Sequence, residues 1–172
     1  MANPQPGDPT ASLPASHPHV DPAERYERGM ALKKAGLYKA AIEQFDQAAR
    51  DPAYALKAEA QKGICYKSAG LYEEAVRSFQ RALKASPVSS KETVQILYAL
   101  GRTLESLGRV EETLEAYRWI RREDPGYRDV AGRIEQLSTR RSEPVHVKSA
   151  AAERTRTGGI MKSWQDLLRI TR

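Results

Sequence analysis

The chain alternates between segments in which apolar residues recur every three or four positions and short segments rich in Gly, Pro or Asp. Apolar residues at that spacing lie on one side of an α-helix, which then packs against a neighbouring element. The stripe is clearest in three segments: Ala41, Phe45 and Ala48; Ala75, Val76, Phe79, Ala82 and Leu83; and Val110, Leu114, Tyr117 and Ile120. The whole pattern predicts helices at about 22–34, 38–50, 54–68, 72–85, 91–106 and 110–122.

Residues that start and stop helices agree with this pattern. Asp21-Pro22 suits a helix start, because the acid caps free N–H groups and proline fits the first helical position. Gly108 falls where a helix has to end and the chain reverses, which suits a left-handed C-terminal cap. Pro125 follows the last predicted helix and prevents its continuation.

One pattern of glycine, aromatic and small residues occurs three times. Gly29 and Gly63 are 34 residues apart, whereas Gly70 and Gly108 are 38 apart, and we place the extra residues in the loop around 88–93. The last copy consists of Leu97, Leu100, Gly101, Leu104, Gly108, Tyr117 and Pro125. The middle copy consists of Gly63, Tyr66, Gly70, Tyr72, Ala75, Phe79, Ala82 and Pro87, and the first of Gly29, Leu32, Gly36, Tyr38, Ala41, Phe45 and Ala48.

These residues and their period resemble the tetratricopeptide repeat family. The resemblance implies an all-α fold, a right-handed α-solenoid of helix–turn–helix repeats at about 22–53, 56–87 and 94–125. The large residue expected four places before each internal glycine is Arg25, Glu59 or Leu97, never tryptophan. Thr113 replaces the small alanine of the third repeat, and we expect it to loosen that repeat.

A helix without a partner follows Pro125. Val130, Ile134 and Leu137 recur at helical spacing, and a solenoid needs a terminal helix to cover its last apolar face. We therefore expect a capping helix at about 126–138, which completes a seven-helix domain over residues 21–138.

The two ends of the chain differ from this domain in composition. Five prolines among residues 1–20 predict a disordered tail, and residues 139–159 have the composition of a flexible basic linker. Residues 160–171 then form a short amphipathic pattern, which predicts a docking helix with Ile160, Met161, Trp164, Leu167 and Leu168. This helix has three candidate destinations: the chain's own groove, the groove of a second copy, or a different protein, which we favour.

Charge and composition narrow the class of protein. The net charge is +6, and residues 139–172 carry 8 basic and 3 acidic side chains, so most of the excess lies there. No apolar run approaches the roughly 20 residues of a membrane helix, and no secretory signal is visible. With a single cysteine, these features predict a cytoplasmic protein. The abundance of alanine and arginine suggests a bacterial source.

The sequence shows no catalytic constellation. Its three histidines, His17, His19 and His146, fall in the predicted tails, and no phosphate-binding glycine loop is present. The acid pairs Glu73-Glu74 and Glu111-Glu112 open helices, where carboxylates favour the positive end of the helix dipole. We expect no enzymatic activity, cofactor, metal site or small-molecule substrate.

By the same resemblance, the first helix of each repeat lines a concave groove that binds a partner protein. A mixture of basic, aromatic and thioether side chains there suits a peptide with acidic and apolar residues. The predicted groove residues are Tyr26, Met30, Lys33, Lys34, Lys57, Lys67, Tyr98 and Arg102. Met30 stands where one branch of the family has an asparagine that grips a chaperone's C-terminus, so we expect no such clamp.

The predicted function is therefore that of an adaptor or scaffold with a peptide groove and a C-terminal docking helix. The alternative is polyanion binding, to nucleic acid or an anionic surface, through Arg140, Arg141, Lys148, Arg154 and Arg156. No aromatic residue accompanies these arginines for base stacking, so we favour a solvated linker over nucleic-acid binding.

Overall fold

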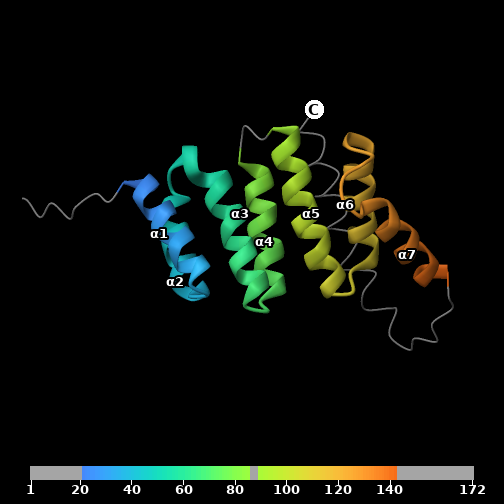
Figure 1. Ribbon diagram of the computed structural model, residues 1–172, viewed down its shortest axis with the longest axis horizontal. Helices are drawn as coiled ribbons and strands as arrows, with labels where there is room; N and C mark the ends of the chain where they lie inside the picture. The colour runs from blue at the N-terminus through green and yellow to red at the C-terminus, as the bar shows by residue number, and fades with distance from the viewer. Residues whose placement is uncertain (1–20, 86–88, 143–172) are drawn as a thin grey trace, which may run out of the picture.

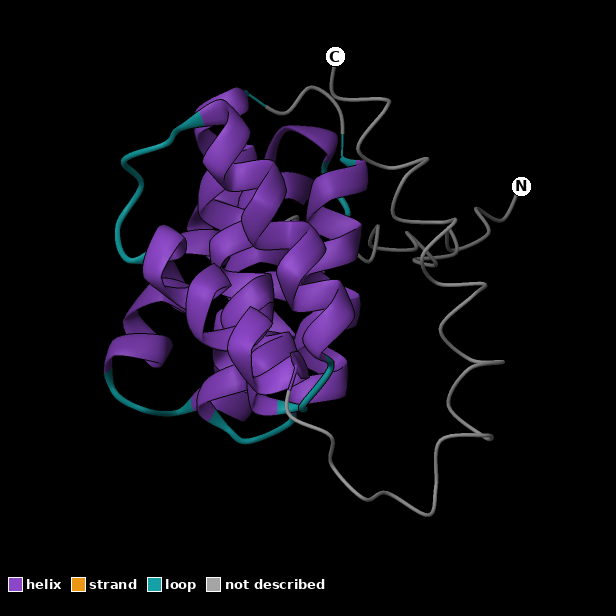
Figure 2. Cartoon of the chain, turned by 90° about the vertical axis from the view of Figure 1, so that its right-hand side faces the viewer, coloured by secondary structure: helices purple, strands orange, loops and turns teal. Residues whose placement is uncertain are grey.

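The computed structural model describes residues 21–85 and 89–142 of the chain, without the side chains of 140–142. The described part consists of α1 (Pro22–Lys34), α2 (Tyr38–Ala48), α3 (Pro52–Ser68), α4 (Tyr72–Lys84), α5 (Ser90–Ser106), α6 (Val110–Glu123) and α7 (Val130–Ser142). These helices stand side by side in one row, from α1 at one end to α7 at the other (Figure 1). Viewed from the α7 end, the described chain is helices joined by short loops, with no strand (Figure 2).

The first helix of each pair starts at a side-chain cap. Asp21 accepts a hydrogen bond from the Ala23 amide at 3.1 Å, and Asp51 accepts one from the Ala53 amide at 2.8 Å. Ser89 and Glu92 form a reciprocal capping box at the start of α5. The free N–H groups of these helix starts are thus satisfied locally, which fixes where α1, α3 and α5 begin.

Glycine ends each of these helices. Gly36, Gly70 and Gly108 have φ angles of +76°, +77° and +71°, in the left-handed region that glycine adopts without strain. In each case the following amide donates to a carbonyl five residues back, as Arg109 does to Leu104 at 3.0 Å. This Schellman-type closure turns the chain directly into the second helix, and it confirms the predicted cap at Gly108.

A second set of glycines brings the paired helices together. A Cβ on Gly29 would lie 2.7 Å from the Phe45 ring, and one on Gly63 would lie 2.7 Å from the Phe79 ring. Gly101 stands in the same relation to the Tyr117 ring. The aromatic residue of each second helix therefore packs on the bare backbone of its first helix.

The buried side chains form two clusters along the row. The larger cluster joins α4, α5, α6 and α7 and contains Phe79, Leu97, Leu100, Leu114 and Tyr117. The smaller one lies between α2 and α3 and has Phe45, Ala41, Ala48, Ala58 and Cys65 as its buried members. The core therefore thins toward the N-terminal end.

Helix α7 differs from the expected capping helix in its bounds. It begins at Val130 rather than near 126 and continues to Ser142, into the range expected to be linker. The later start follows from Gly126 and from Arg128, whose φ of +48° is not helical. The larger cluster includes the buried side chains of Val130, Ile134 and Leu137. The apolar stripe of α7 therefore packs on the end of the solenoid, as expected.

Thr113 does not open a gap in the third repeat. Its side chain is fully buried, and its hydroxyl donates to the Arg109 carbonyl at 2.8 Å, so the added polar group is satisfied. The buried hydroxyl thus finds a partner within its own helix, and the expectation of a loosened repeat has no structural support.

The fold class predicted from the sequence is confirmed as an all-α, right-handed solenoid of helix–turn–helix repeats. The predicted N-terminal tail, most of the linker and the docking helix at 160–171 lie outside the described residues. So do Lys148, Arg154 and Arg156 and the side chains of Arg140 and Arg141. Within the described ranges, no helix is long and apolar enough to cross a membrane.

Candidate partner-binding face

The first helices of the pairs form one layer of the row. α3 contacts both α1 and α5, in addition to the contacts between consecutive helices. Equivalent positions on these three helices are 34 and then 38 residues apart, as Gly29, Gly63 and Gly101 show. The same offsets place Met30, Ile64 and Arg102 in one column and Lys33, Lys67 and Glu105 in another.

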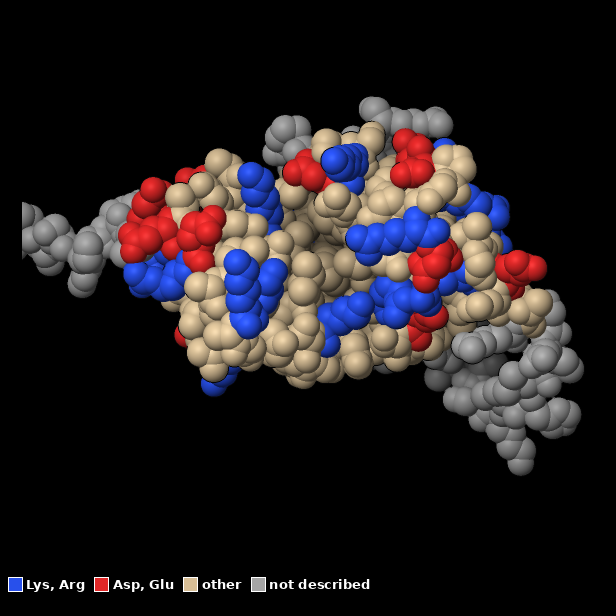
Figure 3. Space-filling model, viewed as in Figure 1, with Lys and Arg blue, Asp and Glu red and all other residues tan. Residues whose placement is uncertain are grey.

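The predicted groove residues all lie on α1, α3 or α5. Lys34 and Lys57 are exposed, whereas Tyr26, Met30, Lys33, Lys67, Tyr98 and Arg102 are half-buried. In the space-filling view, Lys and Arg side chains surround a hollow of uncharged surface near the middle of the row (Figure 3). Half-buried side chains of this mixed kind are what a groove wall requires, because they offer both apolar area and charge.

At the N-terminal end, Tyr26 and Lys33 are tied to their neighbours. The Tyr26 ring lies 5.6 Å from that of Phe45 and 5.8 Å from that of Tyr54, and burial raises the pKa of its hydroxyl. Lys33 donates a hydrogen bond to Gln61 at 2.6 Å, which joins α1 to α3. A neutral partner thus holds the Lys33 side chain in place.

Lys67 is a half-buried cation in the middle of the layer. Within the described part of the chain it forms no ion pair at 4.0 Å or less. Burial and the nearby Arg102 guanidinium lower the pKa of its amine, while Glu105 acts in the opposite direction. Two cations held close together in a half-buried setting attract an acidic group from outside.

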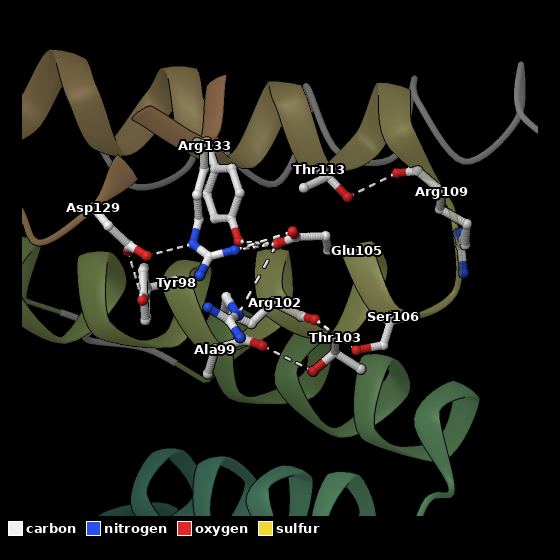
Figure 4. A network of polar contacts seen from close by, with 11 residues as sticks. Tyr98, Ala99, Arg102, Thr103, Glu105, Ser106, Arg109, Thr113, Asp129 and Arg133 are labelled. Atoms are coloured by element: carbon white, nitrogen blue, oxygen red, sulfur yellow. Dashed lines mark hydrogen bonds and ion pairs between the residues drawn. The ribbon is translucent and has the colours of Figure 1, made fainter. Parts of the chain in front are cut away.

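At the C-terminal end, α5 and α7 are joined by a network of polar contacts (Figure 4). Arg133 donates to both carboxylate oxygens of Glu105, at 2.9 and 3.0 Å, and to Asp129 at 2.6 Å. The Tyr98 hydroxyl donates to Asp129 at 2.8 Å. The network therefore fixes Tyr98, a predicted groove residue, against the start of α7.

Arg128 completes the aromatic wall at this end. Its guanidinium lies 4.7 Å from the centroid of the Tyr98 ring and 5.3 Å from that of Tyr127. Cation–π contacts of this length hold an exposed arginine in a defined place. They help to hold this non-glycine residue at its φ of +48° in the turn.

The sequence reasoning missed three residues on this face. Ile64 is 36% exposed, although it is apolar and lies between Met30 and Arg102 in its column. Glu105 and Arg133 were also missed, and both take part in the network at the C-terminal end. The repeat offsets applied to Met30 and Lys67 point to Ile64 and Glu105, whereas Arg133 lies on a helix without a counterpart.

Lys62 and Glu112, both buried and away from this face, have ion-pair partners. Lys62, only 3% exposed, donates to Asp46 at 2.6 Å and to Glu59 at 2.9 Å, and its hydrogen bond lowers the pKa of Asp46. Arg109 forms two hydrogen bonds with the buried Glu112, at 2.6 and 2.7 Å. Within residues 21–85 and 89–142, no group of three or more metal-ligating side chains occurs.

Stacked helix pairs with a layer of first helices define this molecule as a helix–turn–helix solenoid. The family model of the tetratricopeptide repeat matches residues 26–89 and 61–128, which together span more than half of the chain. The chain therefore belongs to the tetratricopeptide repeat family. Its fold is an interaction module, generally non-catalytic, that binds other proteins.

Solved structures confirm the likeness of fold. MamA from Desulfovibrio magneticus RS-1, residues 41 to the end, is 23% identical with a TM-score of 0.62, over 87% of this chain and 80% of that one. A double mutant of MamA RS-1, termed ArsTM, is 22% identical with a TM-score of 0.62, over 88% and 82% of the two chains. No curated protein matches this chain significantly in sequence.

Proposed function

We propose that this protein is a non-enzymatic adaptor that binds a partner peptide on the layer formed by α1, α3 and α5. The peptide carries acidic and apolar residues. The proposal rests on two half-buried cations, Lys67 and Arg102, that act on each other electrostatically. The exposed apolar side chain of Ile64 lies on the same face.

The chemistry of the face matches such a peptide. An acidic side chain between Lys67 and Arg102 relieves their mutual repulsion and forms charge-assisted hydrogen bonds. A neighbouring apolar side chain covers Ile64 and Met30, which removes their apolar area from water. An extended peptide reaches both, because alternate side chains point the same way.

We further propose that residues 160–171 form a second docking element for a different protein. This segment of the sequence contains Trp164 among Ile160, Met161, Leu167 and Leu168. It also carries Lys162 and Arg169 against one acid, Asp166, so its charge has the same sign as the groove. Like charges oppose docking on the chain's own groove and favour an external partner, in keeping with the cytoplasmic adaptor predicted from the sequence.

Charge reversal on the groove face is expected to weaken peptide binding strongly. The variant is the triple K33E/K67E/R102E, tested in the full chain. Peptides selected from a displayed random library against the wild-type chain should be rich in Asp, Glu, Leu and Ile. Their affinity should fall at least about tenfold in the variant, because one lost charge contact costs about 1.4 kcal/mol or more.

The matched control reverses three exposed cations on the second helices, K39E/K84E/R118E. It makes the same change in net charge on the opposite side of each pair. Both variants should keep the helical circular-dichroism spectrum, since surface substitutions change stability little. Equal loss of binding in both would assign the effect to overall charge and refute the groove.

Fluorescence is expected to reveal whether Trp164 docks on an external protein. Trp119 is only 8% exposed in the core, so Trp119→Phe removes its signal and leaves Trp164 as the sole tryptophan. We expect a water-like emission maximum in the free protein and a blue shift when a binding partner is added. Emission that is already blue-shifted and insensitive to dilution would show instead that the segment folds back on its own chain.

A further inference from the structure

Glu105 occupies an unexpected place on the groove face. The column that carries Lys33 on α1 and Lys67 on α3 carries this acid on α5. Its carboxylate lies 4.0 Å from Arg102 and acts electrostatically on Lys67. An unpaired carboxylate there would compete with any acidic peptide for the same two cations.

Arg133 of α7 forms an ion pair with this carboxylate. Its Nη1 donates to the two oxygens of Glu105 at 2.9 and 3.0 Å, far closer than the 4.0 Å of Arg102. Its Nε donates to Asp129 at 2.6 Å, so the guanidinium is held from two sides (Figure 4). The Tyr117 hydroxyl, 3.1 Å from Glu105, supplies a further donor from α6.

We propose that Arg133 pairs with Glu105 so that Lys67 and Arg102 stay available for an acidic side chain of a bound peptide. Docking of α7 thereby sets the affinity of the groove, and α7 contributes to recognition as well as covering the core. This inference rests on the proposed function of the groove. Arg133 is a positioning residue in this scheme, because it acts on the peptide through Glu105.

The physical basis is competition for a small number of charges. Each of these side chains is partly shielded from water, with exposures of 19% for Arg133, 26% for Glu105 and 37% for Arg102. Charges in such settings interact more strongly than on an open surface. Without Arg133, Glu105 interacts instead with Arg102, 4.0 Å away, and with Lys67, on which it already acts electrostatically.

The first experiment measures the electrostatic effect of Arg133 and Glu105 on Lys67 in the absence of peptide. The pKa of the Lys67 amine is followed by NMR of its side chain in the full-length wild type, R133M, E105Q and R133M/E105Q. We expect R133M to raise this pKa, because the freed Glu105 stabilises the ammonium. We expect E105Q to lower it, and the double variant to lie close to the wild type.

The second experiment measures binding of a defined peptide probe. The probe is a short fluorescein-labelled peptide of Leu, Glu and Gly, compared with a counterpart in which Gln replaces Glu. R133M should weaken binding of the Glu peptide about threefold to fivefold, the usual size of a partly exposed charge interaction. R133M/E105Q should restore it, and R133K, which keeps the charge, should bind nearly as the wild type does.

The two measurements separate the inference from the proposal on which it rests. A Lys67 pKa that is the same in folded R133M and E105Q as in the wild type would overturn the role of Arg133. If R133M fails to fold, the test rests on E105Q alone. An unchanged pKa of the Lys67 amine in E105Q also overturns the role of Arg133. A pKa that responds as expected, with no binding of either peptide to any variant, would refute the peptide groove and leave the charge coupling intact.

Discussion

Replacing Gly101 by leucine is expected to destabilise the protein by more than about 3 kcal/mol, because α5 and α6 can no longer approach each other. Any Cβ at this position runs into the Tyr117 ring, which is fully buried and hydrogen-bonded to Glu105. The ring cannot move aside without emptying the larger core cluster. The effect should appear as a large fall in the midpoint of thermal or urea unfolding.

The matched control for this change is Gly132→Ala. Gly132 also lies inside a helix, but a Cβ there would meet no atom within 4 Å. Alanine should therefore stabilise α7 by up to about 1 kcal/mol, through helix propensity alone. If Gly101→Leu melts within a degree of the wild type, the packing of Tyr117 on the α5 backbone is wrong.

Truncating Phe79 to alanine should have the second largest effect, a loss of about 3–5 kcal/mol. Phe79 is 1% exposed, lies on Gly63 and belongs to the cluster that joins α4 to α7. Because the neighbouring helices are fixed by their own contacts, the site cannot collapse to fill the cavity. A loss of this size is a large fraction of the stability of a typical small domain.

Phe45→Ala offers an informative comparison with Phe79→Ala. Phe45 is equally buried and packs on Gly29 in the same way, but it belongs to the smaller cluster near the N-terminal end. Since each repeat contacts only its neighbours, damage here should open α1 and α2 locally. Hydrogen exchange should rise in residues 22–48 for Phe45→Ala and across the whole domain for Phe79→Ala. Identical exchange patterns would contradict the division into two clusters.

The sequence by itself determined the repeat and the ends of its helices. Gly36, Gly70 and Gly108 need a left-handed backbone, and Asp21 offers a cap to the helix that it precedes. These are local requirements, because they involve a residue and its near neighbours along the chain. Gly101 also indicates close packing of two helices, since a glycine inside a helix is costly unless another element lies against it.

The tertiary structure decided how the charges on the candidate partner-binding face are paired. Lys33, Lys67 and Arg102 look alike as isolated basic residues in the sequence, yet each has a different neighbour in the fold. Lys33 is bonded to Gln61, Lys67 lacks a paired acid among the described residues, and Arg102 shares Glu105 with Arg133. A local sequence pattern does not show which residues of separate helices contact each other.

Helix α7 also has one feature that the sequence determines and one that only the tertiary structure determines. The apolar stripe of Val130, Ile134 and Leu137 predicted that a helix would cover the last repeat, because a 3.6-residue period is visible in the sequence. The role of Arg133 depends on how α7 is rotated against α5. That rotation brings Arg133 to Glu105, 28 residues away along the chain, and only the folded structure determines it.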